Sequence, residues 1–235
     1  MIRFRTAGLL ALGTLALTGC AGGGPAPAPS APARPAVAPL LSAGFPPAAD
    51  RARAQLAGLK VAWGEHWRTY DRKKFGDGWS DATDAPGGRN GCDTRDDVLR
   101  RDLRELRVGD RNPCVVLSGV LHDPYTGKRL PYSYRKASRI QTDHVVALGA
   151  AWRAGAWAWT PGRRLAYAND LDVLLATDKD ANFEKSSRTP DTWLPPRAAY
   201  RCEYGRRWTG IKAKYALTVS PPEKKALEKL LAGCR

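Results

Sequence analysis

Histidine is scarce in this chain, and its cysteines are not arranged in close pairs. Only three histidines occur among 235 residues. None of the five cysteines stands in a Cys-x-x-Cys pair, the arrangement that supplies ligands to many thiolate zinc sites. No zinc finger or other sequence-reading module is visible. These absences argue against a structural zinc domain.

The sequence also lacks a recognisable calcium-binding motif. Asp77, Asp81 and Asp84 follow one another in a loop rich in Gly and Asp, but the spacing lacks the ordered loop and the terminal glutamate of an EF-hand. We therefore expect a solvated loop there and not a calcium site. The chain also lacks the zinc set or the paired-carboxylate motif that would favour a cell-wall hydrolase.

The first 19 residues have the pattern of a secretory signal. Residues 1–5 are basic, residues 7–17 are apolar, and Leu17-Thr18-Gly19-Cys20 closes the segment. The apolar stretch is too short for a membrane-spanning helix. Its ending resembles a bacterial lipobox, in which Cys20 is acylated and becomes the first mature residue. The alternative is an ordinary signal peptide that happens to end beside a cysteine. Both predict an extracellular protein, and the lipobox predicts a cell-membrane lipoprotein.

Composition changes after the signal. Residues 20–50 consist mainly of Ala, Pro and Gly without a hydrophobic period. Such a segment cannot bury enough apolar surface to offset its chain entropy, so we expect a semi-extended tether. The remaining residues 51–235 have the length of one domain, and the chain's eight Trp and eight Tyr can supply its core.

Basic residues outnumber acidic ones. Residues 1–19 contain two arginines and no acid, so the chain without them has 36 basic and 23 acidic residues, a net charge of +13. This balance favours polyanionic partners, either nucleic acid or an anionic cell envelope. A high arginine content can also reflect codon bias, so the charge supports a function without identifying it.

Four cysteines remain once Cys20 is set aside, namely Cys92, Cys114, Cys202 and Cys234. An even number in an exported chain predicts two disulfides. Three pairings are open. We favour the local pairing, Cys92 with Cys114 and Cys202 with Cys234, because each bridge would close a short segment and pin a peripheral element to the core.

Hydrophobic periodicity and turn residues predict an α+β domain. The strand that returns from the turn at residues 123–127 contains Pro131, which favours an edge position. We expect helices over residues 50–61, 95–106, 145–156, 161–168, 177–187, 196–214 and 222–232, and strands over residues 114–121, 128–134, 138–142 and 172–176.

Aromatic residues recur through the segment after the first predicted helix. They are Trp63, Trp67, Tyr70, Phe75 and Trp79. A series of this kind is more often core lining than a ligand platform, so we expect these rings to be buried.

The most informative residues are Asp143 and His144, at the end of a predicted strand. Asn182 and Lys185 lie three residues apart on a predicted helix and therefore share a face. Asp143 and Asn182 offer two oxygens to a hard divalent cation. His144 can accept a proton from an attacking water, and Lys185 can hold a phosphate. A one-metal phosphodiesterase needs these groups. The alternative is a core histidine and an exposed asparagine.

Several stretches around these residues resemble HNH endonucleases of the ββα-metal class. The likeness is greatest to secreted HNH-family proteins related to the C-terminal domain of GmrSD-type restriction enzymes, and it runs from about residue 60 to the end. The stretches that carry it are residues 140–146 (IQTDHVV), 169–170 (ND), 174–175 (LL) and 182–185 (NFEK), together with 91–95 (GCDTR), 193–196 (WLPP) and Cys202, Tyr204 and Trp208.

The resemblance implies an HNH (His-Me finger) ββα-metal core with added helices and two disulfides. By position, Asp143 and Asn182 would be the metal ligands and His144 the general base. Asn169 would orient the loop of this histidine through backbone hydrogen bonds. The 25 positions from His144 to Asn169 exceed the interval in compact HNH motifs and contain inserted helices.

The resemblance also implies partners and a reaction. Lys185, Arg188 and Arg139 would contact substrate phosphates, and the cofactor would be one divalent metal, Mg²⁺ in preference to Mn²⁺. We thus expect a secreted or surface-anchored endonuclease that hydrolyses DNA or RNA with weak sequence preference. Its partners would be the nucleic acid and, through Cys20, the membrane, with no obligate protein partner evident. The alternative is a catalytically inactive, polyanion-binding lipoprotein of the cell envelope.

Overall fold

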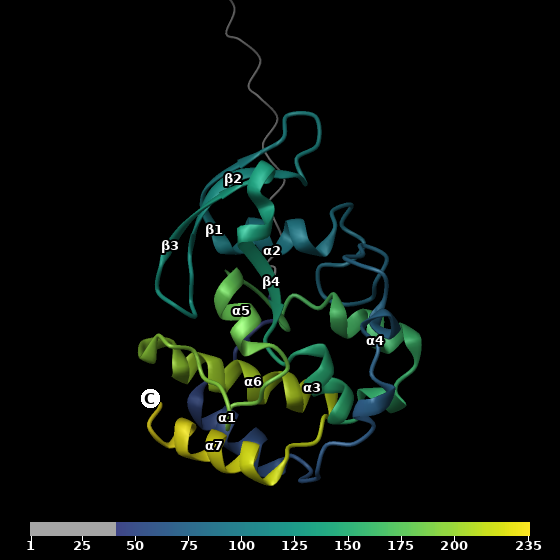
Figure 1. The fold of residues 1–235 in the computed structure, drawn as a ribbon, viewed down its shortest axis with the longest axis vertical. Helices are drawn as coiled ribbons and strands as arrows, with labels where there is room; N and C mark the ends of the chain where they lie inside the picture. Colours follow the sequence, from purple (N-terminus) through teal and green to yellow (C-terminus); the bar gives the residue numbers. More distant parts are fainter. Residues whose placement is uncertain (1–40) are drawn as a thin grey trace, which may run out of the picture. The chain divides into compact units, whose positions relative to one another are not determined.

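Two antiparallel sheets and seven α-helices make up residues 41–235, the part of the chain that the computed structural model describes (Figure 1). The α+β class is therefore confirmed. The predicted signal, Cys20 and most of the predicted tether lie outside these residues. Within them, no helix has both the length and the apolar character needed to cross a bilayer.

The elements form a three-stranded sheet, a two-stranded sheet and helices around them. The strands are β1 (Leu103–Val108), β2 (Val116–His122), β3 (Arg129–Ser133), β4 (Ile140–His144) and β5 (Leu174–Asp178). The helices are α1 (Ala49–Gly58), α2 (Thr94–Asp102), α3 (Leu148–Arg153), α4 (Pro161–Ala168), α5 (Lys179–Lys185), α6 (Arg201–Tyr215) and α7 (Pro221–Ala232).

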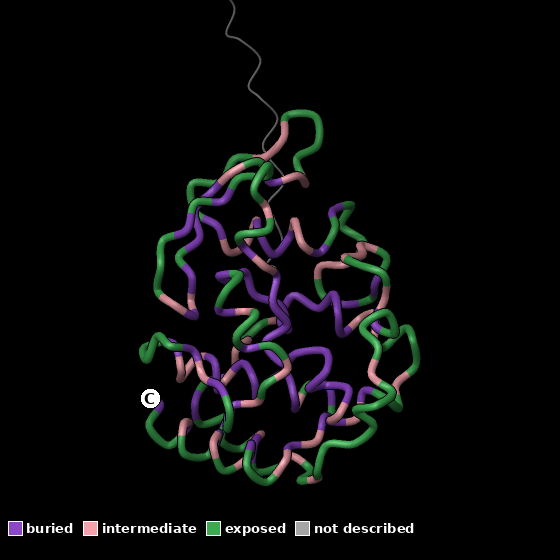
Figure 2. The backbone as a smooth tube through the Cα atoms, viewed as in Figure 1, coloured by how far each residue is buried: buried purple, intermediate pink, exposed green. Residues whose placement is uncertain are grey.

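The larger sheet has the strand order β1-β2-β3, with both pairs antiparallel. Pro131 lies on β3, an edge strand as expected, where a residue without an N–H is tolerated. In Figure 1 this sheet lies at one end of the domain, and helices α1, α6 and α7 lie at the other. Strand β4 and helix α5 lie between them, and β4 is buried along most of its length (Figure 2).

The prediction of a helix over residues 95–106 is wrong for the last four of these residues. Helix α2 ends at Asp102, and β1 follows at once. Hydrogen bonds to β5 hold the end of α2. Asp102 accepts a hydrogen bond from the backbone N–H of Ala176 at 2.8 Å. Arg101 donates to the carbonyl oxygen of Leu174 at 2.8 Å. Pairing with β2 then overrides the helical periodicity, and it leaves Leu106 38% exposed.

The turn between β2 and β3 is tied to the second sheet. Asp123 is fully buried and accepts hydrogen bonds from the hydroxyl of Thr177, at 2.7 Å, and the N–H of Asp178, at 3.1 Å. Both partners belong to β5. The turn therefore holds Tyr125, also fully buried, within hydrogen-bond distance of Asp143 on β4.

The helical end of the domain is closed by the second disulfide. Cys202 on α6 is bonded to Cys234, just after α7, as the local pairing predicted. Between these helices, the indole of Trp208 donates to Glu223 at 2.6 Å, and Lys212 pairs with the same carboxylate at 2.6 Å. The buried charges are thus paired, as a low-dielectric core requires.

Residues 41–50, which composition assigned to the tether, pack on the domain instead. Phe45 lies against the main core and Ala49 is buried. A Cβ at Gly210 of α6 would approach Pro47 to 2.8 Å and Phe45 to 3.0 Å, so the absence of a side chain there admits this segment. The tether was predicted from the average composition of residues 20–50, which does not reveal that one residue, Phe45, packs against the core. Helix α1 also starts one residue earlier than expected, at Ala49, and ends at Gly58.

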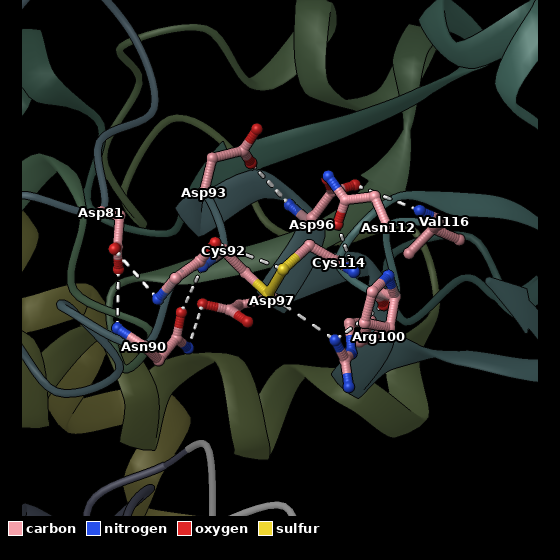
Figure 3. Close-up of a disulfide and its surroundings, with 12 residues drawn as sticks. Asp81, Asn90, Cys92, Asp93, Asp96, Asp97, Arg100, Asn112, Cys114 and Val116 are labelled. Carbon is pink, nitrogen blue, oxygen red and sulfur yellow. Dashed lines mark hydrogen bonds between the residues drawn. A yellow bond between two sulfur atoms is a disulfide. The ribbon is translucent and has the colours of Figure 1, made fainter. Parts of the chain in front are cut away.

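The first disulfide joins Cys92 and Cys114, again as the local pairing predicted (Figure 3). Beside it, Asp93 caps α2 by accepting from the N–H of Asp96 at 2.9 Å. Asp81 accepts from the N–H groups of Asn90 and Gly91 at 2.8 and 3.0 Å. This carboxylate orders its own loop, and residues 41–235 contain no cluster of three or more acidic, His or Cys side chains able to hold a metal.

Asp97 in this region provides a prediction about pH and stability. It is 4% exposed and accepts from the amide of Asn90 at 2.8 Å (Figure 3). Burial raises the pKa of Asp97 to about 6 from its usual 3.8. The folded state therefore holds the proton more tightly than the unfolded state. The stability that this carboxyl contributes below pH 4 is lost as the pH rises through 6.

Asp97→Asn removes this titration and keeps an oxygen for the Asn90 amide. We expect the variant to be more stable than the parent by about 1–2 kcal/mol at pH 7.5 and by much less near pH 4. Urea unfolding at both pH values measures the difference. An equal change at both values would show that the carboxylate charge is not the cause.

Candidate active site

Strands β4 and β5 and helix α5 form one continuous unit. The strands pair antiparallel, with Asp143 opposite Leu175 and His144 opposite Leu174. Helix α5 starts directly after β5, where Asp178 accepts from the N–H of Asp180 at 2.7 Å and so caps the helix. The order strand, strand, helix agrees with the expectation for this segment.

Asp143 lies near the end of β4 and is 5% exposed. One carboxylate oxygen, Oδ1, accepts from Lys185 Nζ at 2.9 Å, and Oδ2 accepts from the hydroxyl of Tyr125 at 2.7 Å. Burial raises the pKa of Asp143, while the ammonium of Lys185 opposes that shift. The carboxylate is thus held by two groups from distant segments.

The structure places Lys185 in the interior and not at the cavity surface, where a substrate phosphate was expected to meet it. Its side chain is 0% exposed, and besides Asp143 it donates to the carbonyl oxygen of His144 at 2.9 Å. Helical spacing correctly placed Asn182 and Lys185 near one face of α5, but Lys185 is turned toward β4. An enclosed ammonium cannot reach a ligand in solvent. Lys185 instead neutralises Asp143 and fixes the end of β4.

The ring of His144 is oriented by a backbone carbonyl. Its Nε2 lies 2.9 Å from the oxygen of Ala168. A carbonyl only accepts hydrogen bonds, so Nε2 carries the hydrogen and Nδ1 of the neutral ring is an acceptor. The ring also lies nearly parallel to two aromatic rings, Trp79 with centroids 5.6 Å apart and Tyr167 at 6.4 Å.

Burial makes His144 far less basic than a free imidazole. It lowers the pKa of His144 to about 3, and the positive charge of Arg72 acts in the same direction. A solvated imidazole would have a near-neutral pKa, and the enclosure of the ring removes that property. The ring is consequently neutral at physiological pH, and Nδ1 is free to accept a proton.

A cavity of about 400 Å³ brings the three central residues of the prediction together, since Asp143, His144 and Asn182 all line it. A second cavity of about 390 Å³ shares Arg72, Trp79, His144 and Leu148 with the first. The first cavity is here called the catalytic cavity. It is also lined by Tyr70, Arg72, Trp79, Arg95, Gly149, Phe183, Ser186 and Ser187.

Two basic residues of the catalytic cavity were missed. Arg95 on α2 donates to the hydroxyl of Thr142 and the carbonyl oxygen of Ile140, both at 3.0 Å, and so fixes the start of β4. Arg72 is exposed at the start of a short 3₁₀ helix, Arg72–Phe75. The signals were present, because Arg95 closes the GCDTR stretch and Arg72 opens a basic run. Neither signal shows that the residue lines the same cavity as Asp143.

Asn169 is buried, but its partners differ from the expected ones. Its side-chain oxygen accepts from the N–H of Ser80, and its amide donates to the carbonyl oxygen of Leu165, at 2.9 and 3.0 Å. It makes no side-chain hydrogen bond to the segment after His144. Asn169 therefore braces the end of α4 next to Ala168, and it acts on His144 only through that neighbour.

The remaining predicted substrate contacts lie outside the catalytic cavity. Arg139 is exposed immediately before β4, and Arg188 is exposed after α5. Arg188 lines a neighbouring groove instead. The structure thus brings together the predicted ligands and base. Lys185 contacts Asp143 from the protein interior, and Arg139 and Arg188 do not line the cavity.

The donors fit a hydrated Mg²⁺ ion better than a metal held entirely by protein. Asp143 and Asn182 line one cavity, and each carboxylate oxygen of Asp143 keeps a second lone pair beyond the bonds to Lys185 and Tyr125. Mg²⁺ commonly binds one or two protein oxygens and retains several waters. The competing feature is the ammonium of Lys185, which already neutralises Asp143.

Comparison with known proteins places these residues in a family. Residues 93–230 match the family model described as GmrSD restriction endonucleases, C-terminal domain. A protein of Arthroderma benhamiae described as an uncharacterized secreted protein is 36% identical over 190 residues, which cover 80% of this chain and 87% of that protein. No solved structure matches the chain. The matched region contains the whole β4-β5-α5 unit.

Proposed function

Because the chain belongs to the family of GmrSD restriction endonuclease C-terminal domains, we propose that it is a secreted endonuclease that hydrolyses phosphodiester bonds of nucleic acid. The observation that carries the proposal is the meeting of Asp143, His144 and Asn182 in one cavity. The relative's description as a secreted protein supports work outside the cell, and attachment through an acylated Cys20 is part of the proposal.

His144 is the general base in this proposal. The carbonyl of Ala168 holds Nε2–H, so Nδ1 can take a proton from the attacking water. The low pKa of the free site does not oppose this role, because a negatively charged phosphate in the cavity favours the protonated ring and raises the pKa again. Arg72 and Arg95 line the same cavity and are suited to contact that phosphate.

Asp143 and Asn182 would hold the divalent metal, Mg²⁺ or Mn²⁺. When bound, such an ion neutralises charge on the phosphate and on the leaving 3′ oxygen. Tyr125 and Lys185 position Asp143 for this task through their hydrogen bonds. The aromatic rings of Trp79 and Tyr167 pack against His144, so the base needs little reorganisation.

One observation favours the second candidate, a catalytically inactive protein that binds polyanions. Both oxygens of Asp143 are already engaged, one of them by a buried ammonium. If Lys185 stays in place permanently, the chain keeps a positive surface without a working metal site.

Metal-dependent cleavage separates the two candidates. We expect the purified protein to nick supercoiled plasmid in Mg²⁺ or Mn²⁺, to stop in excess EDTA, and to resume when the metal is restored. Agarose gels of the plasmid forms give the rate. Plasmid that is bound but left intact in Mg²⁺, Mn²⁺ and Ca²⁺ would decide for the inactive polyanion-binding protein.

A further inference from the structure

Three aromatic side chains are exposed together beside the catalytic cavity, and two of them, Trp63 and Trp67, were expected to be buried. Trp63 is 69% exposed, Trp67 is 52% exposed and Phe183 is 64% exposed. All three line one groove of about 690 Å³, here called the aromatic groove. Large apolar side chains grouped in an exposed groove indicate a binding surface.

The aromatic groove is continuous with the catalytic cavity. Phe183, Ser186 and Ser187 line both. On the other side, the ring of Trp67 stacks on Tyr70, with centroids 5.3 Å apart and planes 9° from parallel. Tyr70 lines the catalytic cavity. A ligand chain can therefore pass from one space to the other without leaving the surface.

Gly149 on α3 lets the walls of this passage approach each other. A Cβ at this position would lie 2.7 Å from the hydroxyl of Ser187 and 3.0 Å from the ring of Trp67. Any larger residue would push these groups apart. The walls of the passage, Ser187 and Trp67, are thus held close to the backbone of α3 at Gly149.

The position of Trp67 is also held from the groove side. The guanidinium of Arg153 lies 5.2 Å from the centroid of its ring, and the same guanidinium donates to the carbonyl oxygen of Ser187 at 2.9 Å. This contact places one face of Trp67 and ties it to the segment after α5. Such a fixed ring loses little freedom when a planar ligand stacks near it.

Charge in the aromatic groove points to aromatic recognition and not to recognition of a duplex backbone. Its positive residues, Arg153, Arg188 and Lys212, are matched by its negative residues, Glu184, Asp191 and Glu223. A groove without net charge has little attraction for a row of phosphates. Its aromatic rings instead suit planar bases, and bases are available for stacking only where strands are unpaired.

We propose that the aromatic groove binds unpaired bases of single-stranded nucleic acid next to the phosphate that enters the catalytic cavity. This inference rests on the proposed function and names its substrate class. Trp63 and Phe183 supply the stacking surfaces, and Trp67, already in contact with Tyr70 and Arg153, forms a fixed wall beside them. Arg72 and Arg95 receive the phosphate at the other end of the passage. Stacking of this kind tolerates any base sequence.

Binding in EDTA tests the groove without any cleavage. The probes are a fluorescein-labelled oligo(dT) of about 12 nucleotides and the same strand paired with oligo(dA), measured by fluorescence anisotropy with the full chain. We expect the single strand to bind at least ~10-fold more tightly than the duplex, and Trp63→Ala/Phe183→Ala to weaken single-strand binding by about 10- to 100-fold.

Tyr134→Ala is the matched control, because Tyr134 is an exposed aromatic residue (60%) that lines neither space. It should leave the affinity unchanged, and thermal melting checks that each variant is folded. Equal affinity for single strand and duplex, or no loss in the double variant, overturns the inference.

The inference and the proposed function fail in different experiments. Plasmid cleavage with unaltered single-strand affinity in the groove variant removes the inference and leaves the nuclease. Groove-dependent binding of oligo(dT) without cleavage in any metal supports the binding site and removes the nuclease.

Discussion

Replacing His144 with alanine is expected to lower the rate of plasmid cleavage by about 10²- to 10⁴-fold, the usual loss when a general base is removed. Nucleic-acid affinity in EDTA should remain, because His144 contributes to the proposed reaction and not to the basic surface. The ring is buried and holds the carbonyl of Ala168, so alanine also leaves a small cavity. Rates are therefore compared only under conditions where the variant is shown to be folded by circular dichroism.

Two further variants make this result decisive. His144→Gln keeps a side-chain amide that can donate to the carbonyl of Ala168, yet it offers no base at neutral pH. It should be as inactive as the alanine variant and closer to the parent in stability. His122→Ala is the control, since His122 is exposed on β2 and does not line the catalytic cavity. Folded His144 variants with rates within about twofold of the parent would eliminate His144 as the base.

Loss of the Lys185 ammonium is expected to destabilise the fold by about 3–5 kcal/mol in Lys185→Met. The substitution retains most of the side-chain volume, but it leaves Asp143 as a buried carboxylate with only the hydroxyl of Tyr125 as a partner. An unpaired charge in the interior is far more costly than a missing pair. Urea unfolding at neutral pH, followed by tryptophan fluorescence, measures the change.

The double variant Lys185→Met/Asp143→Asn tests the cause of this loss. Removing both charges together should recover a large part of the stability, because no buried ion is then left unpaired. Lys179→Met is the control from the exposed start of the same helix. If the single variant loses less than about 1 kcal/mol, or the double variant is the least stable of all, the ion pair does not hold β4 and α5 together.

The β4-β5-α5 unit was predictable because the residues that indicate each element are close together in the sequence. The strand before Asp143, the strand before Asp178 and the helix bearing Asn182 were each expected within a few residues of their observed positions. Helix α4 was predicted at its observed bounds, since Pro161 marks its first turn. The disulfide pairing followed from short loops. Each of these features depends on neighbours in the chain.

The errors arose where distant segments decide. Lys185 looked like a phosphate contact because a helix face carries no information about what covers it. Tyr125 reaches Asp143 from a turn 18 residues earlier, and Trp79 stacks on His144 from a loop still further away. Similarly, the second half of the predicted helix over residues 95–106 became β1 because β2 was there to pair with it. The periodicity of a segment does not show which distant segment will pair with it or cover it.

Hairpin tips are ordinarily the places where a protein accepts inserted peptides. The tip between β2 and β3 is an exception, because Asp123 is bonded to β5 and Tyr125 to Asp143. A change of its length would be transmitted straight to the carboxylate of the candidate active site. Engineering of this protein, for example insertion of an affinity tag or a dye, should therefore use the exposed residues 110–113 between β1 and β2.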